Sequence, residues 1–137
     1  MLLMATSLDA SSLGLLHVWA PYGERTIRNY PSDDEFGIYV EESRQQAAAD
    51  LDRVVQSFKG RLDGVPATLL RGAPEKVIPA FVVSEGIDIV VMGTVARAGI
   101  AGMLIGNTAE RILRKLPCSV LTVKPDEFVS PVSLEAT

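Results

Sequence analysis

The stretch 88-DIVVMGTVARAGIAGMLIGNTAERILRKLPCSVLTVKP-125 decides the fold class. It begins in an apolar run (residues 87–92), passes through a glycine-rich loop and becomes a helical pattern over residues 107–116. A second apolar run, residues 118–123, follows. A strand, a helix and another strand in succession are typical of the βαβ unit, in which a right-handed crossover joins two parallel strands.

The same alternation extends toward the amino terminus. The pattern predicts a helix over residues 1–12, a strand over 13–20, a loop over 21–34, a helix over 35–62, a strand over 67–70 and a helix that begins at Pro74 and contains Pro79. The run LGLLHVWA at 13–20 has no polar alternation, as expected for a strand that is buried on both faces of a parallel sheet. The sequence therefore predicts an α/β domain with a doubly wound parallel sheet.

Composition excludes several classes of protein. The 137 residues suffice for one domain with a core, and the net charge of -4 without a basic stripe argues against a nucleic-acid binder. No apolar run is long enough to span a bilayer, and no cleavable leader pattern is visible. Cys118 is the single cysteine, so no internal disulfide can form. A reducing, cytoplasmic setting is the expectation.

The glycine-rich loop after Met92 leaves open two interpretations. Ligands of open α/β sheets bind at the carboxyl ends of the strands, and glycines there let a ligand approach the backbone closely. A helix that opens at Asn107, with Glu110 completing a capping box, would present unpaired N–H groups to a phosphate. The alternative is a flexible connector whose glycines only serve turns. It is not a Walker A loop, because no Lys-Ser/Thr pair follows Gly106.

Other polar residues give no catalytic or metal site. His17, the only histidine, is expected to be a core imidazole with a satisfied hydrogen bond, and no Cys/His cluster accompanies it. Ser84 and Ser119 lack a base, so a hydrolase triad has no support. The acidic run at residues 33–35 is expected to be a solvated loop.

Longer matches in the sequence point to a family. Residues 88–125, LGLLHVWA at 13–20 and the Gly72-x-Pro74 helix entry resemble the universal stress protein family, over most of the chain from about Leu2 to Pro125. The segments GTVARAGI (93–100), IGNTAE (105–110) and EKVIP (75–79) are most similar to one domain of the tandem, two-domain members of the family. The resemblance implies a Rossmann-like fold with a five-stranded parallel sheet in a domain over residues 1–125, followed by a tail over 126–137.

The resemblance also implies a nucleotide motif, Gly-x-x-Gly-x9-Gly-Ser/Thr, which some members of the family carry and others lack. Gly93 and Gly106 match it, whereas Ala96 replaces the second glycine and Asn107 replaces the hydroxyl residue, with Thr108 immediately after. Val18 would line the adenine, and Met92 with Gly93 would contact the ribose. The implied cofactor-binding set is Val18, Met92, Gly93, Ala96, Arg97, Gly106, Asn107 and Thr108.

A further departure concerns the first strand of the family, which carries an aspartate that contacts adenine. The sequence begins partway along the first helix, so that strand and its aspartate are missing. Three interpretations stay open: the given sequence starts late, another segment fills the central position, or the sheet is rearranged.

The sequence therefore predicts a universal stress protein domain that acts as a non-enzymatic small-ligand-binding or regulatory module in a stress response. The alternative is an ATP-binding member with slow hydrolysis, and the two departures predict weak or absent binding of ATP or another adenine nucleotide. The pocket is expected at the carboxyl ends of the strands near Ala20 and Met92. A homodimer through the strand from Cys118 to Val123 is expected, with no metal, nucleic-acid or membrane partner.

Overall fold

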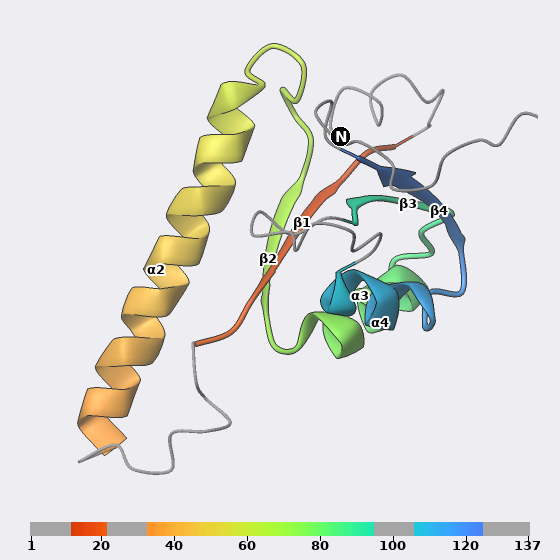
Figure 1. Ribbon diagram of the computed structural model, residues 1–137. Helices are drawn as coiled ribbons and strands as arrows, with labels where there is room; N and C mark the ends of the chain where they lie inside the picture. The colour runs from red at the N-terminus through yellow and green to blue at the C-terminus, as the bar shows by residue number, and fades with distance from the viewer. Residues whose placement is uncertain (1–11, 22–32, 95–105, 125–137) are drawn as a thin grey trace, which may run out of the picture. The chain divides into compact units, whose positions relative to one another are not determined.

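The structure, a computed structural model, describes residues 12–21, 33–94 and 106–124. Parallel strands alternate with helices, as Figure 1 shows, and this confirms the α/β fold class. The elements are β1 (Leu15–Trp19), α2 (Asp33–Ser57), β2 (Ala67–Arg71), α3 (Pro74–Ser84), β3 (Ile89–Gly93), α4 (Asn107–Leu113) and β4 (Ser119–Val123). The helix predicted over residues 1–12 and the tail after residue 125 lie outside the described residues.

The chain forms two compact units, and the boundary between them falls inside α3, between Val77 and Ile78. The first unit contains β1, α2 and β2, and the second contains β3, α4 and β4. None of the described helices combines the length and apolar composition needed to cross a bilayer.

In the first unit β1 and β2 pair in parallel, and α2 lies beside both strands (Figure 1). The backbone N–H of Leu15 donates to the carbonyl of Pro66 over 2.8 Å, and the carbonyl of Trp19 accepts from the N–H of Gly72 over 2.8 Å. In a parallel ladder the N–H and C=O of one residue point to the same neighbouring strand, and successive residues alternate. Leu15, His17 and Trp19 therefore bond to β2, while the backbone groups of Leu16 and Val18 point to the other edge of β1.

In the second unit β3 and β4 form an equivalent parallel pair. The N–H of Ser119 donates to the carbonyl of Asp88 over 3.1 Å. By the same alternation Val90 and Met92 bond to β4, and the backbone groups of Ile89 and Val91 point to the opposite edge of β3.

The five-stranded sheet implied by the family resemblance is not formed by the described strands. Their ladders are two separate pairs, β1–β2 and β3–β4. In the doubly wound order 3-2-1-4-5 the second and third strands lie on one side of the first strand, and the fourth and fifth on the other. No described strand hydrogen-bonds to both of the observed pairs.

Both ends of α2 differ from the prediction. The helix begins at Asp33, so the acidic residues 33–35 form its first turn and not a loop. Carboxylates are favourable there because the amino-terminal end of a helix carries partial positive charge. The helix ends at Ser57 instead of Leu62, and Gly60 adopts a φ of 86° in the turns that follow. A positive φ cannot continue a right-handed helix, and glycine adopts it without the strain that other residues would meet, so the helix ends before Gly60.

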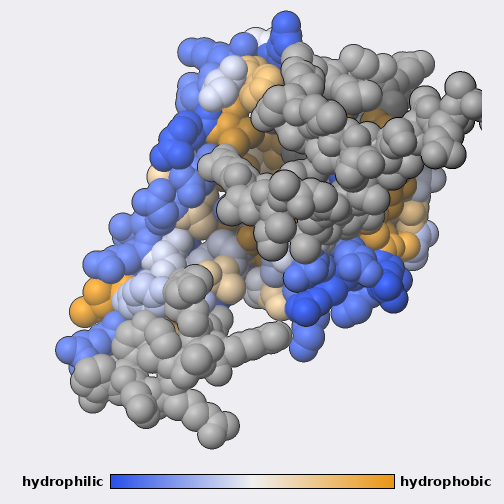
Figure 2. All heavy atoms as spheres, viewed as in Figure 1, coloured by the Kyte–Doolittle hydropathy of each residue, from blue (hydrophilic) through white to orange (hydrophobic). Residues whose placement is uncertain are grey.

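The buried apolar core of the described residues is small. It consists of Ala47, Leu62, Val82, Ala109 and Ile112, and no large side chain in the described part of the chain is fully enclosed. β1 and β3 have the apolar sequences of buried strands, yet all residues of β1 are only half-buried, and Ile89 on β3 is 47% exposed. The outer face of α2 is mostly hydrophilic, with a hydrophobic patch toward its amino-terminal end in Figure 2. Ile38, in the second turn of α2, is 60% exposed.

Candidate functional site

The glycine-rich segment is closed at its base by one backbone hydrogen bond. β3 ends at Gly93, and the carbonyl of Thr94 accepts from the N–H of Gly106 over 2.8 Å. α4 begins at the next residue, Asn107. The strand end and the helix start that the sequence predicted are therefore held next to each other in the second unit, and Gly93, Gly106 and Asn107 belong to one local arrangement.

Neither the backbone conformation nor the local packing requires a glycine at Gly93. Its φ is not positive, and among the described residues an added Cβ would meet the carbonyl oxygen of Val123 at 3.9 Å, an ordinary contact. Gly106 likewise has an ordinary extended conformation, with φ -72° and ψ 146°. Close approach of another group to the exposed backbone of Gly93 is the remaining physical reason for a glycine there.

The start of α4 corrects the capping prediction. Gly106 is the N-cap residue, Asn107 is the first residue inside the helix, and no side chain caps the first turn. Asn107 cannot act as the cap because the extended conformation that a cap needs is taken by Gly106. The first intrahelical bond is donated by Glu110 to the carbonyl of Gly106. The N–H groups of the exposed residues Asn107 and Thr108 therefore have no acceptor within the helix.

Thr94 is a polar residue of this site that sequence reasoning missed. It is 2% exposed, and its side-chain hydroxyl Oγ1 has no hydrogen-bond partner. A buried hydroxyl without a partner costs about 1–3 kcal/mol relative to one that is satisfied. The sequence shows a hydroxyl residue directly after the strand, but nothing in the pattern indicates that it is buried without a partner.

Val18 belongs to the first unit, whereas the residues described above belong to the second. It lines a cavity of about 620 Å³, here called the β1–α2 groove. One wall comprises the last three residues of β1 and the residue after it, and the other wall comprises one face of α2. Together they are His17, Val18, Trp19, Ala20, Tyr39, Glu42, Ser43, Gln46, Ala47 and Asp50. Neighbouring residues of a strand point to opposite faces. A cavity lined by four in a row therefore lies at the edge or carboxyl end of β1.

The groove has a polar helix wall. Asp50 accepts hydrogen bonds from Gln46 over 3.1 Å and from Arg53 over 2.9 Å, and the hydroxyl of Ser43 donates to the carbonyl of Tyr39 over 2.8 Å. His17 is half-buried, and its ring forms no hydrogen bond within the part of the chain that the structure describes. The expectation of a core imidazole with a satisfied hydrogen bond is therefore wrong, because the ring lines an open groove instead of packed core.

The end of β1 carries a cation–π contact. The Arg71 guanidinium lies 5.9 Å from the centroid of the Trp19 ring, across the last register pair of β1 and β2. Such contacts contribute about 0.5–1 kcal/mol at exposed sites. The contact holds the Trp19 ring at the carboxyl end of the strand, beside the groove.

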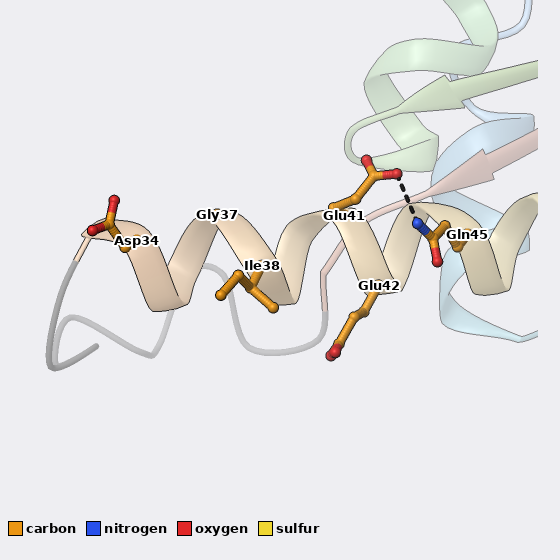
Figure 3. A pocket seen from close by; sticks show the side chains of 6 residues that line it. All are labelled: Asp34, Gly37, Ile38, Glu41, Glu42 and Gln45. Carbon is orange, nitrogen blue, oxygen red and sulfur yellow. Dashed lines mark hydrogen bonds between the residues drawn. The ribbon is translucent and has the colours of Figure 1, made fainter.

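A second hollow, shown in Figure 3, lies along α2 alone. Asp34, Gly37, Ile38, Glu41, Glu42 and Gln45 line it, and all six come from the same helix. Glu41 accepts hydrogen bonds from Arg44 and Gln45, which lower the pKa of its carboxyl group from 4.5 to about 2. No second described element supplies an opposing wall, so this hollow is a helix surface and not a binding site.

The structure thus describes the predicted site in two parts. Met92, Gly93, Gly106, Asn107 and Thr108 belong to the second unit, and Val18 belongs to the first. Ala96 and Arg97 lie outside the described residues. The predicted pocket at the carboxyl ends of both strands stays a prediction.

A parallel strand that ends in a glycine-rich segment and leads into a helix is typical of proteins that bind small molecules on a Rossmann-like fold. The sequence profile of the Universal stress protein family matches residues 2–124. The chain therefore belongs to the universal stress protein family.

Relatives of known sequence agree with this assignment. The chain is 36% identical to Universal stress protein E of Salmonella typhi over 98 residues, which are 72% of this chain and 30% of the relative. It is 32% identical to the Universal stress protein E homolog of Haemophilus influenzae over 116 residues, 83% of this chain and 37% of the relative. The chain thus spans about a third of the length of these relatives, in agreement with its likeness to one domain of two-domain members.

The fold is also similar to that of hypothetical protein MJ0577. The TM-score is 0.68 at 23% sequence identity, over 93% of this chain and 87% of that protein. Hypothetical protein PH0823 gives a TM-score of 0.57 at 21% identity, over 87% of this chain and 81% of that one. Both likenesses concern the fold.

Proposed function

We propose that this chain is a non-enzymatic module that binds a small ligand and regulates a stress response. Membership of the universal stress protein family supports the stress role. One observation carries the binding role: the backbone hydrogen bond from Gly106 to Thr94 closes the base of the glycine-rich segment. It holds the end of β3, at Gly93, next to the start of α4, which no side chain caps.

An adenine nucleotide is the alternative ligand, and ATP with slow hydrolysis the alternative activity. Two departures from the family motif argue for weak or absent binding. Ala96 adds a Cβ where backbone should lie close to phosphate, and Asn107 offers an amide in place of a hydroxyl. The N-cap position of α4 is held by Gly106 and not by Asn107.

Calorimetric titration with ATP tests this proposal. We expect a dissociation constant weaker than about 1 µM, which corresponds to a binding free energy less favourable than about -8 kcal/mol. The double variant Ala96→Gly and Asn107→Ser should bind ATP more tightly than the wild type, because it restores the motif at both positions. The exposed Thr122→Ser exchange on β4 is the matched control and should change nothing.

The outcomes separate the two functions. ATP binding near or below 1 µM by the wild type, together with phosphate release that the variant accelerates, would replace the regulatory proposal with the ATPase. We propose a non-enzymatic role because the sequence offers no evident general base beside the glycine-rich segment. If neither the wild type nor the double variant binds any nucleotide, the proposed ligand is a small molecule other than a nucleotide.

We also propose that two copies of the chain associate through β4. The backbone groups of Val120 and Thr122 point away from β3, and β4 is uncharged over its whole length. An apolar edge of this kind is normally covered, and antiparallel pairing with a second copy obeys two-fold symmetry. The cytoplasmic setting expected from the sequence fits such a module.

A further inference from the structure

The turn between α2 and β2 contains a reactive dipeptide, Asp63–Gly64. It is the only place in the 137 residues where aspartate or asparagine precedes glycine. Figure 1 shows this turn as the loop that leads from the carboxyl end of α2 into β2, and both residues are exposed. In such a pair the nitrogen of the next peptide bond can close a five-membered ring with the side-chain carboxyl group, and the missing Cβ of glycine leaves the nitrogen uncrowded.

The backbone of the pair forms a type II β-turn. The N–H of Val65 donates to the carbonyl of Leu62 over 3.0 Å, which closes a four-residue turn with Asp63 and Gly64 at its centre. Gly64 has a φ of 78°, whereas the φ of Asp63 is not positive, and this combination is that of type II. Glycine adopts both the positive and the negative φ readily, so it permits the peptide unit between the two residues to rotate.

The two reacting groups are accessible in this turn. Among the described residues the N–H of Gly64 has no acceptor, and a Cβ added to Gly64 would meet no atom within 4 Å. The side-chain carboxylate of Asp63 accepts one hydrogen bond, from the N–H of Gly60 to Oδ1 over 3.0 Å. That bond is exposed and belongs to a turn, so it opens at a lower free energy than the bonds inside a helix or a strand.

We propose that Asp63 is a modification site at which the folded protein isomerises spontaneously to isoaspartate. The nitrogen of Gly64 attacks Cγ of Asp63, a C–N bond forms, and the hydroxyl of the protonated carboxyl group leaves with the amide proton as water. The succinimide ring then takes up one water molecule. Addition at the backbone carbonyl breaks its bond to nitrogen and gives isoaspartate, whereas addition at Cγ regenerates aspartate. Water is the only co-reactant.

Isoaspartate alters the turn and preserves the net charge. The main chain gains one carbon atom between Leu62 and Val65, and the carboxylate moves to Cα. Both ends of the turn are anchored, because Leu62 is 3% exposed and the carbonyl of Pro66 accepts from the N–H of Leu15 over 2.8 Å. The modified protein should therefore lose the bond from Gly60 and unfold at a lower temperature. The product accumulates with time, so the modified fraction records the age of the molecule, whatever ligand the glycine-rich segment binds.

Incubation of the full chain in heavy-oxygen water at neutral pH tests the proposal. Each opening of the succinimide places one solvent oxygen in residue 63. Trypsin in ordinary water then releases the peptide 62–71, in which Asp63 is the only acidic residue, and the peptide 45–53, which carries Asp50 and Asp52 of α2 as the internal control. Mass spectrometry should find label and isoaspartate in peptide 62–71 at least about tenfold faster than in peptide 45–53, because helical aspartates react only after local unfolding.

Two variants test the ring closure itself. Asp63→Asn should form the same succinimide faster than the wild type, since ammonia leaves an amide more readily than water leaves a carboxylate at neutral pH. Asp63→Glu keeps the charge and Gly64 but would need a six-membered ring, so it should stay unlabelled. The matched control Asp52→Asn, at an exposed position of α2, should keep its amide over the same time.

Three results would overturn the proposal. An unlabelled wild type, after a time in which a synthetic peptide of residues 62–71 is labelled, would show that the folded turn prevents the reaction. Equal label in peptides 45–53 and 62–71 would show that the glycine directs nothing. Labelling that falls in proportion to the unfolded fraction when an osmolyte stabilises the protein would assign the reaction to the unfolded chain. All three are measured on the wild type, so they stand even if a variant fails to fold.

Discussion

Replacing Thr94 with valine should make the protein more stable. Thr94 is 2% exposed, and its Oγ1 has no hydrogen-bond partner. Valine has nearly the same shape, so the exchange removes the unsatisfied hydroxyl without opening a cavity. The hydroxyl costs about 1–3 kcal/mol, and we expect the free energy of unfolding to rise by about 1 kcal/mol, the lower end of that range. For a domain of this size the midpoint of thermal unfolding should rise by about 3 °C.

Two companion variants give the result its meaning. Thr94→Ser keeps the hydroxyl and loses one methyl group, so it should destabilise the protein by about 1 kcal/mol. Thr122→Val makes the same chemical exchange on an exposed position of β4 and should change stability by less than about 0.5 kcal/mol. Calorimetry and chemical denaturation of all three proteins measure these differences.

The reasoning fails if Thr94→Val is less stable than the wild type while Thr94→Ser retains wild-type stability. That pattern would show that the hydroxyl forms a stabilising hydrogen bond in solution. A stabilised Thr94→Val protein, in contrast, identifies a position where the native sequence keeps a polar group at a cost. Such positions are concentrated at functional sites, and Thr94 adjoins Gly93.

Three further predictions follow from particular residues. Gly72→Ala should lower the free energy of unfolding by about 1–3 kcal/mol, because Gly72 has a φ of 143° and an added Cβ would lie 2.7 Å from Cγ2 of Val77. Adding Val77→Ala removes the steric contact and should restore only part of the lost stability; full restoration in denaturation experiments would refute the part of the cost assigned to backbone strain. Glu41 should titrate with a pKa of about 2, below its ordinary 4.5, because Arg44 and Gln45 donate hydrogen bonds to its carboxylate. Its contribution to stability is therefore present above about pH 4.5 and is lost as the pH falls through 2, and an NMR titration at low salt that finds an ordinary pKa would contradict these hydrogen bonds. Thr122→Pro should convert the proposed dimer to a monomer in sedimentation, since it removes an outward N–H of β4 and no bond to β3; a wild type that already sediments as a monomer at micromolar concentration would end the dimer proposal.

The sequence predicted the order and type of the described elements because each carries a strong local signal. The apolar runs became β1 and β3, and Pro74 began α3 as its missing N–H allows. The ends of α2 and the cap of α4 were wrong for a shared reason. Periodicity reports which face of a helix is apolar, whereas a helix end depends on the conformation of single residues such as Gly60 and Gly106.

The candidate site could be predicted only in part for a different reason. Glycine spacing marked Gly93 and Gly106, and the structure joins both to one neck. The full burial of Thr94 and the half-burial of His17 depend on what packs around them, and residues distant in sequence decide that. His17 shows the difficulty clearly, since an imidazole within an apolar run is usually enclosed, and here it lines the open β1–α2 groove.

Strand pairing is where local and long-range information diverge most. The composition of β1 and β3 predicts strands paired on both edges, and that composition is a property of a few consecutive residues. The pairing itself depends on which strand lies alongside, and the described ladders give each of them one neighbour. The exposed 47% of Ile89 on β3 and the half-buried residues along β1 are the measurable consequence. The few consecutive residues that define the composition of a strand therefore do not specify which segment pairs with it, because that segment lies far away in the sequence.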